Sequence, residues 1–207
     1  MNFPRASEIL SKMKTAGVLM LSILILFFGF SGPTYAAPAE RQLVTVEHVD
    51  LTRYQGRWYE IASIPQFFQR KCVKNTMADY TIMSESLVRV TNSCVTKENQ
   101  TMSSEGRAKP QEASNAKLKV TFAKIFDQYL FWFSGKYWVI YLEPNYQYAV
   151  IGHPTRDYGW ILSRTPDLPE DTLKELVQFL KVGGYDPCRF QTTPQDGGLS
   201  TKKSLCK

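Results

Sequence analysis

Polar and apolar residues alternate along short segments in the middle of the chain. In residues 117–122, Lys-Leu-Lys-Val-Thr-Phe, the alternation is complete, so one face of a strand would meet water and the other a core. Turn residues separate eight such segments, and every connection is too short to hold a crossover helix. The pattern therefore predicts an antiparallel all-β barrel or sandwich. The eight predicted strands span residues 58–64, 73–83, 87–95, 102–108, 117–123, 137–142, 148–152 and 160–164.

The hydrophobic period changes after the last predicted strand. Residues 168–171 are typical of a helix start, because Pro169 lies in the first turn and acidic side chains follow at the positive end of the helix dipole. Gly183 and Gly184 are typical of a helix end. An apolar stripe between these signals predicts one helix that packs on the outside of the sheet. The stripe consists of Leu173, Leu176, Val177 and Leu180.

The N-terminal segment has the pattern of a secretory signal peptide. A positively charged start precedes the uncharged apolar run 16–30, and Thr34 and Ala36 occupy the −3 and −1 positions of the expected cleavage site. A membrane anchor is the alternative, but this run of 15 residues is shorter than the roughly 20 that span a bilayer. We expect an exported protein, periplasmic or secreted, that is soluble after cleavage. The expected organisation is a signal peptide at 1–36, one domain at 37–190 and a polar tail at 191–207, mobile except where Cys206 tethers it.

Composition excludes several classes of protein. The 207 residues are 43% hydrophobic and 13% aromatic, which is too apolar for a globally disordered chain. The net charge of +6 is too diffuse to indicate nucleic-acid binding. His48 and His153 are the only histidines and no Cys-x-x-Cys pair is present, so the sequence predicts no metal site. It also lacks a Gly-x-Ser-x-Gly elbow and a suitably spaced carboxylate pair, so we expect neither catalysis nor a cofactor.

Binding is the function that these features favour. An eight-stranded barrel has an interior just wide enough to be filled by its own side chains or to hold one small ligand. Apolar walls would desolvate a lipid or another hydrophobic molecule at about 25 cal/mol per Å² buried. We therefore expect a hydrophobic small molecule as the partner.

Three segments resemble the signatures of the lipocalin family. Residues 56–62, Gly-Arg-Trp-Tyr-Glu-Ile-Ala, are similar to its first signature, and residues 158–166 are similar to its last. The paired strands 137–140 and 148–151 resemble the middle signature, although Leu-Glu-Pro at 142–144 replaces the usual Thr-Asp-Tyr. The resemblance covers about residues 49–190 and is closest to bacterial lipocalins and apolipoprotein D.

The resemblance implies an eight-stranded antiparallel up-and-down barrel with one C-terminal flanking α-helix, closed at one end and open at the other. It implies that Arg164 stacks on Trp58 at the closed end, where Gly56 begins the first strand. It also implies a carrier of a fatty acid or lysophospholipid that acts in membrane lipid maintenance as a monomer or weak dimer. Positions in related barrels and alternation together rank the ligand-facing residues, although a shift of one residue would turn each set outward. These are Ala78, Tyr80, Phe122, Tyr137, Val139, Ala149, Ile151, Trp160 and Leu162.

Two loops that would surround the open mouth are unusually aromatic. They span residues 64–71 and 125–133, and basic side chains lie beside them. An exposed apolar patch of this kind predicts contact with a membrane surface. A lid over the mouth or a dimer contact is the alternative. The predicted rim residues are Phe67, Phe68, Phe126, Phe131 and Trp132.

The four cysteines predict two disulfides in an oxidising compartment, but several pairings are open. The resemblance to apolipoprotein D implies Cys72 with Cys188, whereas the predicted hairpin also permits Cys72 with Cys94. Each of these leaves a second pair that involves Cys206. Pairing of Cys94 with Cys188 would instead free Cys72. A free thiol there would permit the alternative function, a lipid-modifying lipocalin enzyme.

Overall fold

The computed structural model describes residues 42–206. The predicted signal peptide, residues 1–36, lies outside the described residues. Within the described part of the chain, no helix has the length and apolar character needed to cross a bilayer.

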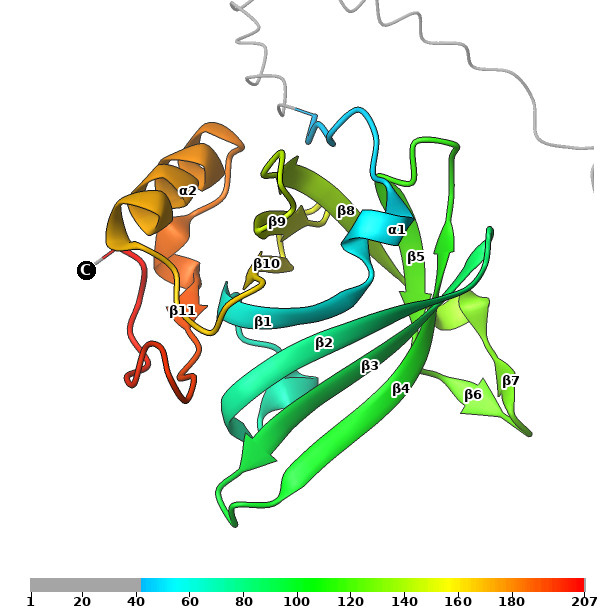
Figure 1. The fold of residues 1–207 in the computed structure, drawn as a ribbon, viewed down its shortest axis with the longest axis horizontal. Coiled ribbons are helices and arrows are strands. Elements are labelled where there is room, and N and C mark those ends of the chain that lie inside the picture. The colour runs from blue at the N-terminus through cyan, green and yellow to red at the C-terminus, as the bar shows by residue number, and fades with distance from the viewer. Residues whose placement is uncertain (1–41, 207) are drawn as a thin grey trace, which may run out of the picture. The chain divides into compact units, whose positions relative to one another are not determined.

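Eight antiparallel strands form a closed barrel (Figure 1). Neighbours in the sequence pair with each other around the wall, and β10 pairs back with β1 to close it. Both ends of every strand lie within two residues of the predicted bounds, so the predicted barrel is confirmed. The strands are β1 (Gly56–Ser63), β2 (Cys72–Ser84), β3 (Leu87–Thr96), β4 (Thr101–Pro110), β5 (Lys117–Thr121), β8 (Gly135–Leu142), β9 (Tyr148–Gly152) and β10 (Gly159–Ser163).

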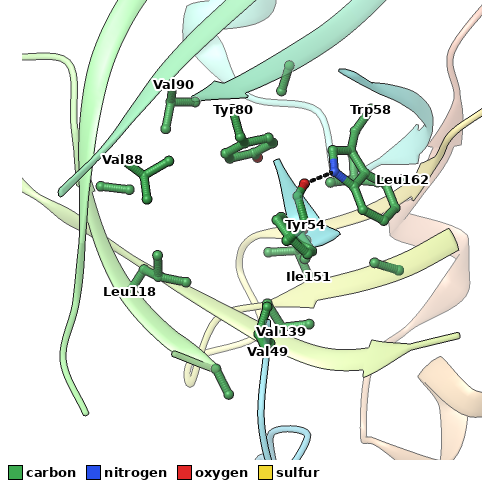
Figure 2. Packing of buried hydrophobic residues seen from close by; sticks show 14 residues of the cluster. Val49, Tyr54, Trp58, Tyr80, Val88, Val90, Leu118, Val139, Ile151 and Leu162 are labelled. Carbon is green, nitrogen blue, oxygen red and sulfur yellow. Dashed lines mark hydrogen bonds between the residues drawn. The ribbon is translucent and has the colours of Figure 1, made fainter. Parts of the chain in front are cut away.

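Alternation along the strands produces two apolar clusters, one on each side of the wall. The first lies inside the barrel and contains Val88, Val139 and Ile151 (Figure 2). The second contains Val150 and Ile161 from the outer face, and α2 (Glu170–Val182) covers it with Leu176 and Leu180. Helix α2 therefore packs outside the barrel through the predicted stripe.

Short elements that carry no clear sequence period complete the fold. Helix α1 (Leu51–Tyr54) precedes β1, and the Asp50 side chain accepts hydrogen bonds from the first-turn backbone amides. The hairpin of β6 (Lys124–Ile125) and β7 (Gln128–Tyr129) is followed by the 3₁₀ turn η2 (Phe131–Phe133). The remaining short elements are η1 (Phe67–Gln69), η3 (Pro187–Arg189) and β11 (Gln191–Thr192).

The expectation that the C-terminal tail is mobile is wrong for residues 191–196. Strand β11 pairs with the end of β1, where β1 and β2 no longer pair with each other. The buried Gln195 amide bridges this gap, because its Nε2 donates to the carbonyl oxygens of Glu60 (2.9 Å) and Thr76 (2.8 Å). The segment therefore completes the barrel wall between the two strands. Polar side chains suit this position because they satisfy backbone groups that the splayed strands leave unpaired.

Two disulfides join the cysteines, Cys72 with Cys94 and Cys188 with Cys206. The Cys72–Cys188 pairing that the resemblance implied is therefore wrong, and the hairpin pairing is the one found. All four cysteines lie among the described residues and none is free. The alternative function that needs a free Cys72 thiol loses its nucleophile, since a disulfide sulfur is no thiolate.

Candidate ligand-binding site

The closed end of the barrel is sealed around Trp58, which is fully buried. Its indole Nε1 donates to the carbonyl oxygen of Tyr54 at 2.8 Å, and the two rings stack with centroids 4.8 Å apart. The guanidinium of Arg164 lies on the Trp58 ring from the solvent side, 4.0 Å from its centroid. Gly56 has φ of +93°, and a Cβ there would come to 3.4 Å from Nη1 of Arg164. Glycine at this position therefore lets the chain turn into β1 directly beneath the guanidinium.

Three tyrosines meet above this seal. The Tyr54 hydroxyl from α1 and the Tyr80 hydroxyl from β2 both hydrogen-bond to the hydroxyl of Tyr137 on β8, at 2.7 and 3.0 Å. Burial raises the pKa of Tyr80 to about 12 and raises the pKa values of Tyr54 and Tyr137 well above their usual value. All three phenols therefore stay protonated at physiological pH, and each has one proton to donate.

The barrel is filled at the closed end and open at the other. On the inward face of β4, Ala108 and Gly106 are buried, whereas Ser104, the next inward position, is exposed. On β3, Val90 is buried and Asn92, which pairs with Ser104, is only partly buried, whereas Cys94, which is bridged to Cys72, is buried again nearer the mouth. Solvent therefore reaches the inner wall at the height of Asn92 and Ser104. This open half is the candidate ligand-binding cup.

A small cavity lies in the closed half between its apolar side chains and the tyrosines. About 10 Å³ is open to the centre of a water molecule, which is about the space of one water. A cavity of this size has no room for a larger ligand, so the open half above the tyrosines is the candidate site. The cavity is lined by Val49, Leu51, Tyr54, Gln55, Tyr80, Ile82, Val88, Ala108, Leu118, Val120, Tyr137 and Val139.

The predicted ligand-facing residues lie on the inner side of the wall. Phe122 is 39% exposed beyond the end of β5, and a Cβ on Gly106 would lie 2.8 Å from its Cδ1. Its ring therefore covers the inward face of Gly106, at the base of the open half. The other predicted residues belong to the interior cluster or pack against it, and ligand contact by any of them stays a prediction. They are Ala78, Tyr80, Tyr137, Val139, Ala149, Ile151, Trp160 and Leu162.

The sequence analysis missed several interior residues. Val88 and Val90 on β3 share the inward face, and their alternation with Arg89 could have identified them. Tyr54 and Val49 gave no such signal, because α1 has only four residues and Val49 precedes it. Among residues 42–206, no group of three His, Cys, Asp or Glu side chains is placed to hold a metal ion.

The aromatic loop between β5 and β8 lies outside the barrel. The Arg107 guanidinium lies 4.3 Å from the ring centroid of Tyr129, and Nζ of Lys109 lies 4.3 Å from that of Phe131. Both basic residues point outward from β4, so they hold the loop against the outer wall. Figure 1 shows β6 and β7 projecting from this side. The loop is therefore not a lid over the mouth.

The rim residues differ in exposure. Phe126 and Trp132 are 95% and 96% exposed, whereas Phe131 is partly buried beneath Lys109. Phe67 and Phe68 in η1 pack edge to face with centroids 5.4 Å apart and are also exposed. The β1–β2 and β5–β8 connections are alternate loops of the meander and so leave the same end of the barrel.

Comparison with known proteins supports the fold and the family. A family model described as a lipocalin-like domain matches residues 49–195. Temperature-induced lipocalin-1 of Arabidopsis thaliana is 39% identical over 158 residues, which cover 75% of this chain and 84% of that protein. Outer membrane lipoprotein Blc of Escherichia coli K12 is 34% identical over 159 residues, covering 76% and 85%.

Other relatives agree with these. Apolipoprotein D of Mus musculus is 31% identical over 159 residues, which cover 72% of this chain and 78% of that protein. The solved structure of insecticyanin from the tobacco hornworm, Manduca sexta, superposes with a TM-score of 0.59. At 22% identity over 76% of this chain and 90% of that one, it supports the fold alone. The closed eight-stranded barrel, the flanking helix and these matches together establish that the chain belongs to the lipocalin family.

Proposed function

We propose that this lipocalin is an exported carrier of a fatty acid or lysophospholipid and that it acts in membrane lipid maintenance. The observation that carries the proposal is the change along the inner wall from buried Ala108 to exposed Ser104. This change in exposure means that the barrel forms a cup with an apolar base and an accessible upper half. An acyl chain that enters this cup leaves water for apolar walls, which stabilises the complex by about 25 cal/mol per Å² buried.

The relatives support the lipid part of the proposal. Small hydrophobic ligands are what the lipocalin family binds, and two of the relatives are named a lipoprotein and an apolipoprotein. The two disulfides support export, since such bonds persist in oxidising compartments.

A substitution pair on β3 tests whether the cup holds the ligand. Asn92→Trp places a large ring on the inward face of the open half, and Thr91→Trp places the same ring on the outer face one residue away. Protein purified from its own source is analysed by native mass spectrometry, and its ligand is extracted with solvent. We expect an acyl lipid on the wild type and on Thr91→Trp and at least a tenfold loss of occupancy in Asn92→Trp. Equal occupancy in both variants, or a non-lipid ligand, would overturn the proposal.

We also propose that the β5–β8 loop contacts anionic membrane surfaces. Phe126 and Trp132 are almost fully exposed, and Lys109, whose Nζ lies 4.3 Å from the Phe131 ring centroid, supplies positive charge beside them, whereas Lys124 pairs with Asp127. Aromatic side chains that enter the headgroup region together with a nearby lysine are typical of interfacial contacts. Because the loop lies outside the mouth, such contact would leave the cup open to a lipid from the bilayer.

Sedimentation with phosphatidylglycerol liposomes tests this contact. We expect the wild type to co-sediment and the double variant Phe126→Ser/Trp132→Ser to stay in the supernatant. Val182→Ser is the matched control, because it removes an exposed apolar side chain from α2. Equal sedimentation of the wild type and the double variant rejects membrane contact through this loop.

A further inference from the structure

The tyrosine chain contains one more hydrogen-bond donor than it uses. Three hydroxyls supply three protons, but the contacts Tyr54–Tyr137 and Tyr80–Tyr137 consume only two. Among residues 42–206, no other group hydrogen-bonds to these hydroxyls. One proton is therefore available to an acceptor that enters from the cup. A buried donor without a partner costs about 1–3 kcal/mol, which favours a ligand that supplies the acceptor.

The tyrosines lie where a ligand would end. Tyr80 pairs with Val90, the buried inward position of β3 next to the partly buried Asn92 of the open half. Tyr137 is the least buried of the three and joins the other two. Figure 2 shows the rings of Tyr54 and Tyr80 between the Val88–Val90 wall and Trp58. The small cavity beside them has room for about one oxygen-sized group.

The surroundings select against a charged acceptor. No Asp, Glu, Lys, Arg or His side chain lines the cavity. The guanidinium of Arg164 lies on the Trp58 ring and donates its hydrogen bonds to backbone carbonyls there. A carboxylate at the tyrosines would be buried without a counter-ion, which is far more costly than burying a neutral carbonyl that accepts a hydrogen bond.

We infer that the chain of Tyr54, Tyr80 and Tyr137 is a recognition site for an uncharged oxygen acceptor at the buried end of the ligand. The acceptor is a ketone, aldehyde or ester carbonyl. This inference rests on the proposed carrier function and adds a polar selectivity to it. A fatty acid in its anionic form would keep its carboxylate at the mouth and gain nothing from the tyrosines.

Three ligands of matched chain length separate the possibilities. Hexadecane, methyl palmitate and palmitate each displace anilinonaphthalenesulfonate from the full-length protein, and the dissociation constants are compared. We expect methyl palmitate to gain about fivefold over hexadecane, as one neutral hydrogen bond provides. In the triple variant Tyr54→Phe/Tyr80→Phe/Tyr137→Phe this gain disappears, while palmitate binds as it does to the wild type. Tyr141→Phe, on the outer face under α2, is the control and changes none of the three constants.

Infrared spectroscopy of the wild type keeps the test independent of the folding of any variant. Methyl palmitate labelled isotopically at its carbonyl carbon is bound, and a lowered C=O stretching frequency relative to hexane solution reports the hydrogen bond. An unshifted band, or an ester advantage that survives in the triple variant, overturns the inference. A loss of palmitate affinity in the triple variant also overturns it, because the site would then bind carboxylate. If none of the three ligands displaces the probe, the carrier function itself fails.

Discussion

The guanidinium of Arg164 lies 4.0 Å from the ring centroid of Trp58 and joins the last barrel strand to the first. Beyond the ring contact, it donates four hydrogen bonds to backbone carbonyl oxygens. Their acceptors are the oxygens of Arg53 (2.7 Å), Tyr54 (3.1 Å), Arg57 (2.8 Å) and Tyr146 (3.2 Å). One planar side chain therefore holds α1, β1 and the β8–β9 turn together at the closed end.

Arg164→Lys should strongly destabilise the fold, even though lysine keeps the positive charge. A lysine ammonium lacks the planar fork, so it can neither lie flat on the indole nor reach all four carbonyls. We expect the free energy of unfolding to fall by about 2–3 kcal/mol in urea denaturation. Arg57→Lys is the control, because its exposed ion pair with Asp79 contributes about 0–1 kcal/mol. Equal effects of the two substitutions would contradict this account of the seal.

Gly56→Ala should destabilise the same seal from below. The positive φ of Gly56 is unfavourable for alanine, and the new methyl group would lie against the Arg164 guanidinium. We expect a loss of about 1–2 kcal/mol in thermal or chemical unfolding. Gly135 offers a matched control in β8, because its φ is not positive and nothing lies within 4 Å of a Cβ there. Gly135→Ala should change the stability little.

Both disulfides should contribute to stability, and their pairing can be read directly. Peptide mapping of the unreduced protein should recover Cys72 linked to Cys94 and Cys188 linked to Cys206, with no thiol available to alkylation. The bridges close loops with separations of 22 and 18 residues, for which loop entropy gives about 3 kcal/mol each. Cys72→Ala/Cys94→Ala and Cys188→Ala/Cys206→Ala measure the two contributions. Recovery of a Cys72–Cys188 peptide would refute the pairing.

The C-terminal segment should behave as part of the barrel wall. Gln195→Ala removes the amide that serves the Glu60 and Thr76 carbonyls, and we expect the free energy of unfolding to fall by about 1–3 kcal/mol. Asp196→Ala is the neighbouring control, since its contact with Lys74 is exposed and worth about 0–1 kcal/mol. Hydrogen exchange at residues 191–196 should show protection comparable to that of β1. Rapid exchange there would contradict this finding and support the predicted mobile tail.

Alkaline pH should destabilise the fold through the buried tyrosines. Their pKa values in the folded protein lie above the unfolded value near 10, Tyr80 at about 12, so the unfolded chain loses protons first as pH rises. Below pH ~10 both states hold these protons and the three phenols add no pH dependence. Above it, stability should fall by up to about 4 kcal/mol per pH unit for three protons. The free energy of unfolding, measured by denaturation at several pH values above 10, should therefore fall less steeply with pH in Tyr54→Phe/Tyr80→Phe/Tyr137→Phe than in the wild type.

Local pattern was enough to predict the strands and the flanking helix. Alternation in 117–122 and the stripe through Leu176 and Leu180 report which face of an element is buried, and burial of that face is what fixes these elements. The same alternation placed Ala149, Ile151 and Leu162 on the inner wall. Motif spacing then indicated the lipocalin family, which the family model and the relatives confirm.

Tertiary structure decided what depends on residues distant in the chain. The sequence left the partner of Cys72 open, and the alignment of β2 with β3 brings Cys94 to it with Cα atoms 5.6 Å apart. The polar composition around Gln195 suggested a mobile tail, but the gap between β1 and β2 supplies carbonyls that need such donors. The tyrosine chain joins α1, β2 and β8, and no local period relates three side chains that only barrel closure brings together.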